Sequence, residues 1–175
     1  MFQLTPGAVF DSQTVNAGKS RLYGAELSLT GRPTRTLTLS AGTGYTNTKF
    51  LDFTVPAGAT NQGAAQGNEF SNAPHWTLSG SATWQHPSGI FANLNAYYRS
   101  AYFQDTVVQT RRDIRPLTIF SAKVGYQGEH FGAFLVASNI FNVEKPLQTF
   151  ADFDGRSRGI MSEPRIIGLS FEGRF

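Results

Sequence analysis

Residues 163–175 read Glu-Pro-Arg-Ile-Ile-Gly-Leu-Ser-Phe-Glu-Gly-Arg-Phe. From Ile167 onward, apolar residues alternate with polar or small ones, which predicts a β-strand with one apolar and one polar face. The large apolar positions are Ile167, Leu169, Phe171 and Phe175. A final Phe adds little to a soluble chain end, whereas membrane β-strands carry aromatic residues at their ends. This stretch therefore suggests that the other strands should be tested for the same pattern.

Six further segments show period-two alternation, so we predict an all-β chain of about seven or eight antiparallel, meandering strands. The clearest of them is 75–86, in which Trp76, Leu78 and Trp84 share a face with Gly80 and Ala82. The least regular is 131–142, because both of its faces are apolar. Residues 1–12 are ambiguous between the end of a strand and a turn. The six predicted strands are 15–30, 35–51, 75–86, 90–104, 116–127 and 131–142.

The aromatic residues of these strands have a spacing that fits a membrane. Trp76 and Trp84 are eight residues apart on one face, which corresponds to about 26 Å along a strand. With the strand tilted by roughly 35–45°, this distance spans the apolar band of a membrane barrel and places one ring at each interface. We predict an aromatic girdle that consists of Tyr45, Trp76, Trp84, Tyr98 and Tyr126.

The connections between the predicted strands alternate in length. Short turns follow the first, third and fifth strands, and longer connections follow the second, fourth and sixth. The two longest, 52–74 and 142–161, are rich in polar and small residues and are predicted to be loops. Short turns on one rim and long loops on the other are typical of an outer-membrane barrel. A β-sandwich has no reason to follow this alternation so regularly.

Composition excludes several other classes of protein. The chain has 175 residues, of which 40% are hydrophobic and 15% charged, and it contains no cysteine. No apolar run approaches the ~20 residues of a transmembrane helix, and a net charge of +3 gives no case for nucleic-acid binding. His75, His86 and His130 lack the spacing of metal ligands. We predict no catalytic residues, no metal and no cofactor, so the protein is not expected to be an enzyme.

Several short motifs occur in an order and spacing that is fairly specific. They are Asn-Ala-Gly at 16–18, Tyr-Gly-Ala-Glu-Leu at 23–27, Gly-Thr-Gly-Tyr-Thr at 42–46, Asn-Ala-Pro at 72–74, Ser-Asn-Ile-Phe-Asn at 138–142, and the end from 164 to 175. With these motifs, nearly the whole chain resembles the C-terminal barrel region of TonB-dependent outer-membrane receptors.

The resemblance implies a 22-strand barrel around an N-terminal plug in the outer membrane of a Gram-negative bacterium. It also implies active uptake of scarce ligands, most often ferric siderophores, with energy from the TonB complex acting through the plug. We predict that residues 1–175 are the C-terminal portion of such a barrel, an incomplete barrel without its plug domain and signal peptide. The expected partners are outer-membrane lipid, the TonB complex, the barrel-assembly machinery and a siderophore-like ligand, with no nucleic acid.

Two groups of residues are candidates for specific roles. By the resemblance, Ile167, Leu169, Phe171 and Phe175 form the signal read by the barrel-assembly machinery; simple packing of Phe175 in the girdle is the alternative. Arg111, Arg112 and Arg115 cluster in one connection. They are candidates for binding an anionic ligand or a lipopolysaccharide phosphate, the alternative being an exposed basic loop.

Two other architectures remain open at this point. One is a small, self-contained eight-stranded outer-membrane barrel with a structural or adhesive role. The other is a soluble β-sandwich that acts as a binding module.

Overall fold

One antiparallel sheet of seven strands dominates the structure. The computed structural model describes residues 2–4, 12–14, 18–55, 63–107, 109, 114–151 and 157–173. The strands follow the order β13-β10-β9-β8-β7-β4-β3, so that each long strand pairs with the next along the chain. The sheet consists of β3 (Lys19–Gly31), β4 (Leu37–Asp52), β7 (Trp76–Gln85), β8 (Ile90–Arg99), β9 (Leu117–Gln127), β10 (Phe131–Ser138) and β13 (Ile166–Gly173).

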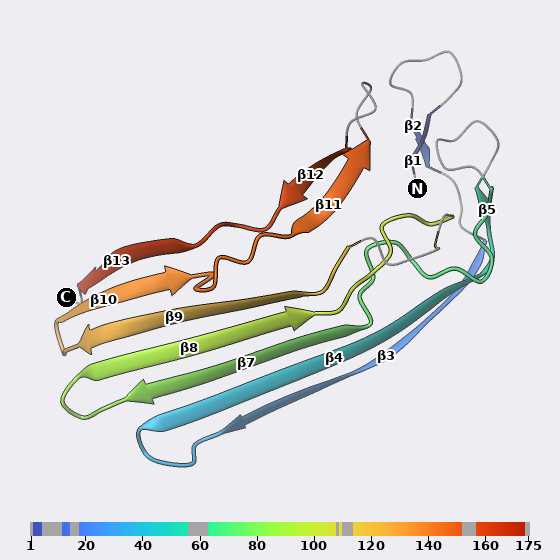
Figure 1. The fold of residues 1–175 in the computed structure, drawn as a ribbon. Coiled ribbons are helices and arrows are strands. Elements are labelled where there is room, and N and C mark those ends of the chain that lie inside the picture. The colour runs from blue at the N-terminus through green and yellow to red at the C-terminus, as the bar shows by residue number, and fades with distance from the viewer. Residues whose placement is uncertain are drawn as a thin grey trace.

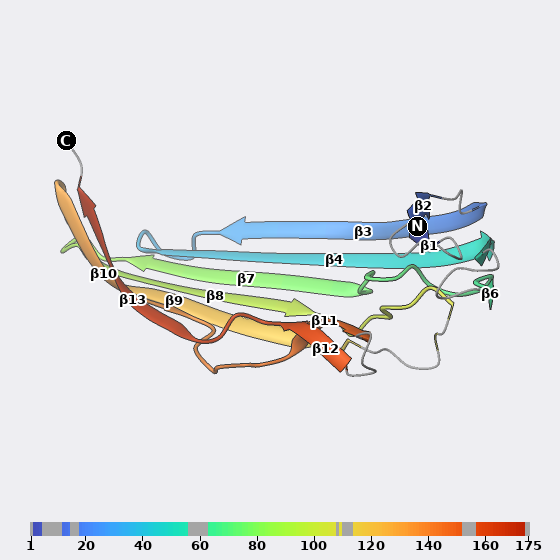
Figure 2. The ribbon, with the colours of Figure 1, turned by 90° about the horizontal axis from the view of Figure 1, so that it is seen from above.

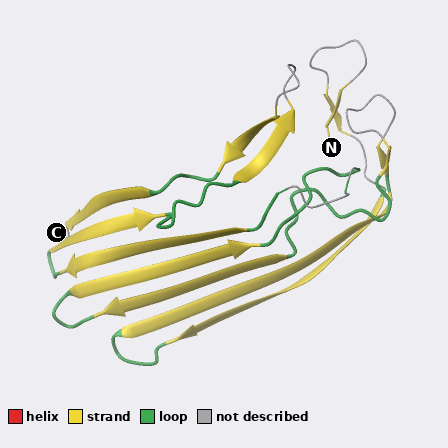
Figure 3. Ribbon diagram, in the orientation of Figure 1, coloured by secondary structure: helices red, strands yellow, loops and turns green. Residues whose placement is uncertain are grey.

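The sheet is a single curved layer, not a sandwich and not a closed barrel (Figures 1 and 2). Within the described residues, β3 and β13 each have one paired and one unpaired edge. Strands and loops account for the described chain (Figure 3), and none of its residues lie in a helix long and apolar enough to cross a membrane. The predicted incomplete meander of about seven strands is confirmed. The self-contained eight-stranded barrel and the β-sandwich do not match this single open layer.

The two rims of the sheet differ in the way the sequence predicted. The short turns after β3, β7 and β9 lie at one end of the strands, near the C-terminus, and the longer connections lie at the other end (Figure 1). Four short strands accompany the longer connections: β5 (Thr54–Val55) pairs with β6 (Gly63–Ala64), and β11 (Pro146–Ala151) pairs with β12 (Ser157–Met161). We call the end of the sheet with the short turns the short-turn rim, and the end with the longer connections the long-loop rim.

The strand register keeps one chemical type on each face. One row across the sheet joins Leu39, Ala82, Leu94, Ala122, Ala137 and Ile167, each the register partner of the next. The next row, on the other face, joins Thr30, Ser40, Ser81, Asn95 and Ser121. Because side chains alternate between faces along every strand, the sheet has a continuous apolar face and a largely polar face.

Burial is the reverse of what a soluble domain shows. Large side chains of the apolar face are exposed, up to 72% for Leu169 and 77% for Phe171. The buried hydrophobic cluster lies instead at the long-loop rim, where Phe50, Phe53, Val55 and Ala65 pack together with Phe70 and Val107 against them. The hydrophobic effect drives apolar surface away from water, so the sheet needs an apolar partner along one whole face.

Three expectations from the sequence need correction. The connections 52–74 and 142–161 are not plain loops, because they contain the β5–β6 and β11–β12 hairpins. The strand predicted at 90–104 ends at Arg99, after which Tyr102 pairs with Ile114 in an isolated bridge. The strand predicted at 131–142 ends at Ser138, since Asn139 adopts a positive φ of 48° and turns the chain. For the strand predicted at 15–30, residues 15–17 lie outside the described residues, and β3 begins at Lys19.

Candidate functional site

The five predicted girdle residues all belong to the apolar face and divide between the two rims. Tyr45 and Trp76 are register partners whose ring centroids lie 4.8 Å apart, and Tyr98 lies on the neighbouring strand next to Leu78. Trp76 and Tyr98 lie at the long-loop end of their strands, and Tyr45 lies at the same level of the sheet because it pairs with Trp76. Trp84 and Tyr126 lie at the short-turn end, close to their turns.

Two further aromatic residues of the same face, Tyr23 and Phe131, were not among the predicted girdle residues. Phe131 is 61% exposed and its ring centroid lies 5.5 Å from that of Tyr126, at the short-turn rim. Tyr23 is exposed on β3 beyond Tyr45, toward the long-loop rim. Each could have been found by extending the alternation of its own strand to the last aromatic position.

The candidate assembly signal forms one edge of the sheet. Ile167, Leu169 and Phe171 alternate along β13, and all three are more than 60% exposed on the apolar face. β13 pairs with β10 through eight register partners from Phe131 to Ser138. Phe175, the fourth predicted residue, lies outside the described residues.

The polar face carries an ion pair that spans three strands. Nζ of Lys123 on β9 lies 2.5 Å from Oε1 of Glu172 on β13, and it also lies 3.8 Å from the ring centroid of Phe134 on the strand between them. Phe134 is buried to 3% exposure and meets Phe91 edge to face at 5.5 Å. This aromatic pair explains why both faces of β10 are apolar. Phe134 belongs to the face of β10 on the otherwise polar side of the sheet, where it packs against Phe91.

Side-chain hydrogen bonds join the connections at the long-loop rim. Asn68 donates from Nδ2 to the carbonyl oxygens of Thr106 and Val107, at 2.9 and 2.8 Å. The hydroxyl of Tyr102 donates to the carbonyl of Leu147 at 2.7 Å. Three connections far apart in sequence are therefore held as one assembly above the sheet.

Two of the recognised motifs have a clear local role at this rim. Asn139 is 2% exposed and donates from Nδ2 to the carbonyls of Val143 and Glu163, at 3.0 and 2.8 Å, while its Oδ1 accepts from the backbone N–H of Val143. Asn72 and Asn142 also have positive φ, at 58° and 49°. Asn tolerates this left-handed conformation better than most residues. The Asn residues of the Asn-Ala-Pro and Ser-Asn-Ile-Phe-Asn motifs therefore shape the turns.

The basic cluster is only partly placed. Arg115 is exposed beside the long-loop rim, and its backbone carbonyl accepts a long contact of 3.5 Å from Nη1 of Arg99. Arg111 and Arg112 lie outside the described residues. The described residues therefore leave the cluster untested, and its role stays a prediction.

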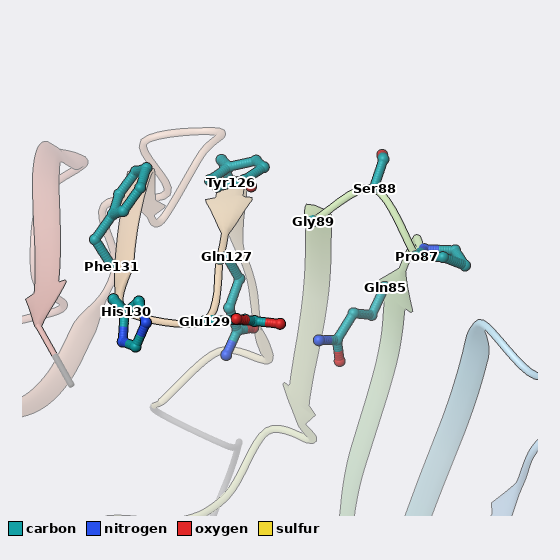
Figure 4. Close-up of a pocket in the computed structure, with 10 residues that line it drawn as sticks. Gln85, Pro87, Ser88, Gly89, Tyr126, Gln127, Glu129, His130 and Phe131 are labelled. Carbon is teal, nitrogen blue, oxygen red and sulfur yellow. The ribbon is translucent and has the colours of Figure 1, made fainter. Parts of the chain in front are cut away.

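A hollow lies at the opposite end, between the β7–β8 and β9–β10 turns (Figure 4). Its lining includes Tyr126 and Phe131 on the apolar side and Gln85, Gln127 and Glu129 on the polar side. It is an open gap between two turns. Among the described residues, no group of three or more His, Asp or Glu side chains is arranged to hold a metal ion.

Solved structures with the same fold place this geometry in a larger molecule. The ferric yersiniabactin uptake receptor FyuA from Yersinia pestis matches 89% of this chain with a TM-score of 0.72 and 16% identity. The siderophore receptor PiuA from Acinetobacter baumannii matches 87% with a TM-score of 0.71 and 18% identity. The ferric-catecholate import receptor Fiu from E. coli K12 matches 97% with a TM-score of 0.66 and 18% identity.

This chain is much shorter than the proteins it resembles. It covers 24%, 21% and 22% of the FyuA, PiuA and Fiu chains. The sequence itself matches the family described as "TonB dependent receptor-like, beta-barrel" over residues 1–143. That match takes in every strand from β3 to β10, and the open sheet, its register and its two unequal rims agree with a section of such a barrel. The chain therefore belongs to the TonB-dependent receptor-like β-barrel family.

Proposed function

We propose that this chain forms a C-terminal part of the barrel wall of a receptor that takes up siderophore-type ligands across the outer membrane of a Gram-negative bacterium. The observation that carries the proposal is the continuous apolar face, whose large side chains are exposed while the polar face lies opposite. Lipid is the partner that can cover such a face along its whole length, and the polar face then lines the barrel interior.

The two rims give the proposed barrel wall its orientation. Outer-membrane barrels have short turns on the periplasmic side and longer loops outside. The short-turn rim, with Trp84 and Tyr126, then lies at the periplasmic interface. The long-loop rim, with Tyr45, Trp76 and Tyr98, lies at the outer interface, so the five residues form the two parts of an aromatic girdle.

The remaining functions belong to the intact receptor. The names of FyuA, PiuA and Fiu support a ferric siderophore as the ligand class. Transport by this family implies a plug domain that contacts the TonB complex, and membrane insertion implies the barrel-assembly machinery. We propose these partners for the full protein, and we propose a receptor rather than an enzyme.

Uptake by the intact receptor tests this proposal. The full-length protein would be expressed in a Gram-negative strain that lacks its own siderophore receptors, and uptake of radiolabelled ferric siderophores of catecholate and other classes would be measured. We expect uptake of at least one class that disappears when TonB is deleted. Correct insertion with no TonB-dependent uptake of any ferric siderophore would contradict the ligand class.

The basic cluster gives a second, narrower test. We propose that Arg111, Arg112 and Arg115 attract an anionic ligand to the long-loop rim, because guanidinium groups bind carboxylate and phosphate oxygens strongly. Replacing all three by Ala in the intact receptor should weaken ligand binding. An unchanged dissociation constant would leave the cluster as an exposed basic loop.

A further inference from the structure

Two positively charged residues oppose each other on the apolar side of the sheet. Arg21 on β3 and Lys49 on β4 are direct register partners, and both are exposed. They follow the same alternation as Tyr23 and Tyr45, so their side chains leave the sheet on its apolar face. Like charges directly opposite each other across two strands are destabilising, so this pair needs a physical reason.

No carboxylate in the described part of the chain neutralises the pair. Neither the His75–Glu69 pair nor the Lys123–Glu172 pair includes Arg21 or Lys49. Asp52 pairs with Lys19, beyond the Ser20–Phe50 pair and a shift of register. The contact that Arg21 does make is a cation–π contact, with its guanidinium carbon 5.5 Å from the ring centroid of Tyr23.

The position of the pair relative to the aromatic residues identifies its surroundings. Arg21 lies two residues beyond Tyr23, and Lys49 four residues beyond Tyr45, both toward the long-loop rim. At ~3.3 Å per residue these offsets are about 7 and 13 Å along the strands. Strand tilt shortens them along the membrane normal, and the headgroup layer begins at the edge of a hydrocarbon core about 30 Å thick. The two cations therefore lie at the level of the lipid headgroups.

We propose that Arg21 and Lys49 bind the phosphate group of a membrane-lipid headgroup in the leaflet around the long-loop rim. The proposal rests on the proposed function, because it requires the apolar face to be embedded in lipid. A guanidinium binds phosphate oxygens through two parallel N–H donors, and an ammonium adds a mobile point charge. Directly opposed residues have Cβ atoms about 5 Å apart, so one phosphate can contact both cations and remove their repulsion.

Lipid binding by the intact receptor provides the test. The purified full-length receptor in uncharged detergent would be titrated with lipid A that carries two phosphates, and bound lipid would be counted by native mass spectrometry. We expect the double variant R21Q/K49Q to bind about tenfold more weakly, because each exposed charge contact contributes only a few-fold in affinity. Lipid A without phosphates should bind the unmodified receptor as weakly as the variant binds the phosphorylated lipid.

Matched controls separate this site from general charge effects. R32Q/R35Q removes two exposed cations from the short-turn rim and should leave lipid A binding unchanged. R21K/K49R keeps both charges and should retain most of the binding. The mobility shift of the barrel on heating, followed by gel electrophoresis, verifies that every variant is folded.

Three results would overturn the proposal. R21Q/K49Q could bind lipid A as tightly as the unmodified receptor does, or R32Q/R35Q could lose as much affinity for lipid A as R21Q/K49Q does. The third is that millimolar inorganic phosphate displaces the lipid completely. The last result would identify a site for free anions. Ferric siderophore uptake would be measured for the same variants. Uptake that is absent while phosphate-dependent lipid binding persists refutes the uptake function alone, and the reverse outcome refutes the lipid site alone.

Discussion

Gly125 is a residue at which a single methyl group should disturb the pairing of strands. It is the register partner of Phe91 on β8 and of Phe134 on β10, and the ring centroids of these two residues lie 5.5 Å apart. A Cβ atom at Gly125 would collide with the backbone oxygen of Ala133 and come within 2.7 Å of Cα of Phe134. We therefore expect G125A to lower the free energy of unfolding of the intact receptor by about 1–3 kcal/mol.

Urea unfolding of the receptor in lipid vesicles, followed by tryptophan fluorescence, measures this effect. The matched control is G168A on β13, where an added Cβ meets no atom within 4 Å. G168A should change stability by less than about 0.5 kcal/mol. Equal stabilities of the two variants would show that the sheet relaxes around position 125.

Asn139 combines a backbone and a side-chain contribution that two substitutions can separate. N139G keeps access to the positive φ of 48° but removes three hydrogen bonds to Val143 and Glu163. N139A removes the same bonds and adds the cost of a left-handed conformation, about 1–2 kcal/mol. We expect N139G to be destabilised by about 1 kcal/mol per lost bond and N139A to be less stable still, measured by the same unfolding assay. If N139A proved more stable than N139G, the left-handed backbone conformation of residue 139 would not carry the expected cost.

At the level of elements, the seven long strands were predictable because their pattern is local. Alternation along β7 or β13 requires no knowledge of the partner strand, and one apolar and one polar face of the sheet make it regular. The hairpins β5–β6 and β11–β12 were missed because their short strands carry little alternation of their own. They are held by contacts between distant connections, such as Tyr102 with Leu147.

The candidate sites differ in the same way: some depend on the pattern of a single strand, and others depend on how strands pair. The place of the predicted girdle residues on the apolar face followed from the sequence, because each aromatic residue stands within the alternation of its own strand. The Arg21–Lys49 pair was not found, because its meaning depends on the register between β3 and β4. The Lys123–Glu172 pair depends on three strands lying side by side and was equally invisible in the sequence.

The terminal strand carries a prediction of its own, about assembly. Ile167, Leu169 and Phe171 present a highly exposed apolar edge on β13, and Phe175 extends the same alternation in the sequence. We expect deletion of Phe175 from the intact receptor to reduce the amount of folded protein in the outer membrane several-fold, because the assembly machinery is expected to read this residue. Surface labelling of whole cells measures the amount. Normal surface levels would leave Phe175 as a packing residue of the girdle.

For the whole molecule, the proposed function requires that the two faces of one sheet meet different solvents. Leu94 and Asn95 are neighbours at the middle of β8, both are exposed, and they lie on opposite faces. We expect L94R to lower the stability of the inserted receptor by about 2–4 kcal/mol, the cost of an arginine on the lipid face near the membrane midplane. N95R places the same charge at the same depth on the polar face.

N95R should therefore cost far less than L94R, even though it gives up the hydrogen bond from Nδ2 of Asn95 to Oδ1 of Asn93. Both variants would be unfolded with urea from vesicles, with the unmodified receptor as reference. The comparison keeps the depth and the introduced charge the same, since the two positions are adjacent in β8 and lie on opposite faces. If N95R proved as costly as L94R, the polar face would be packed against dry protein, and the assignment of lipid to one face and water to the other would fail.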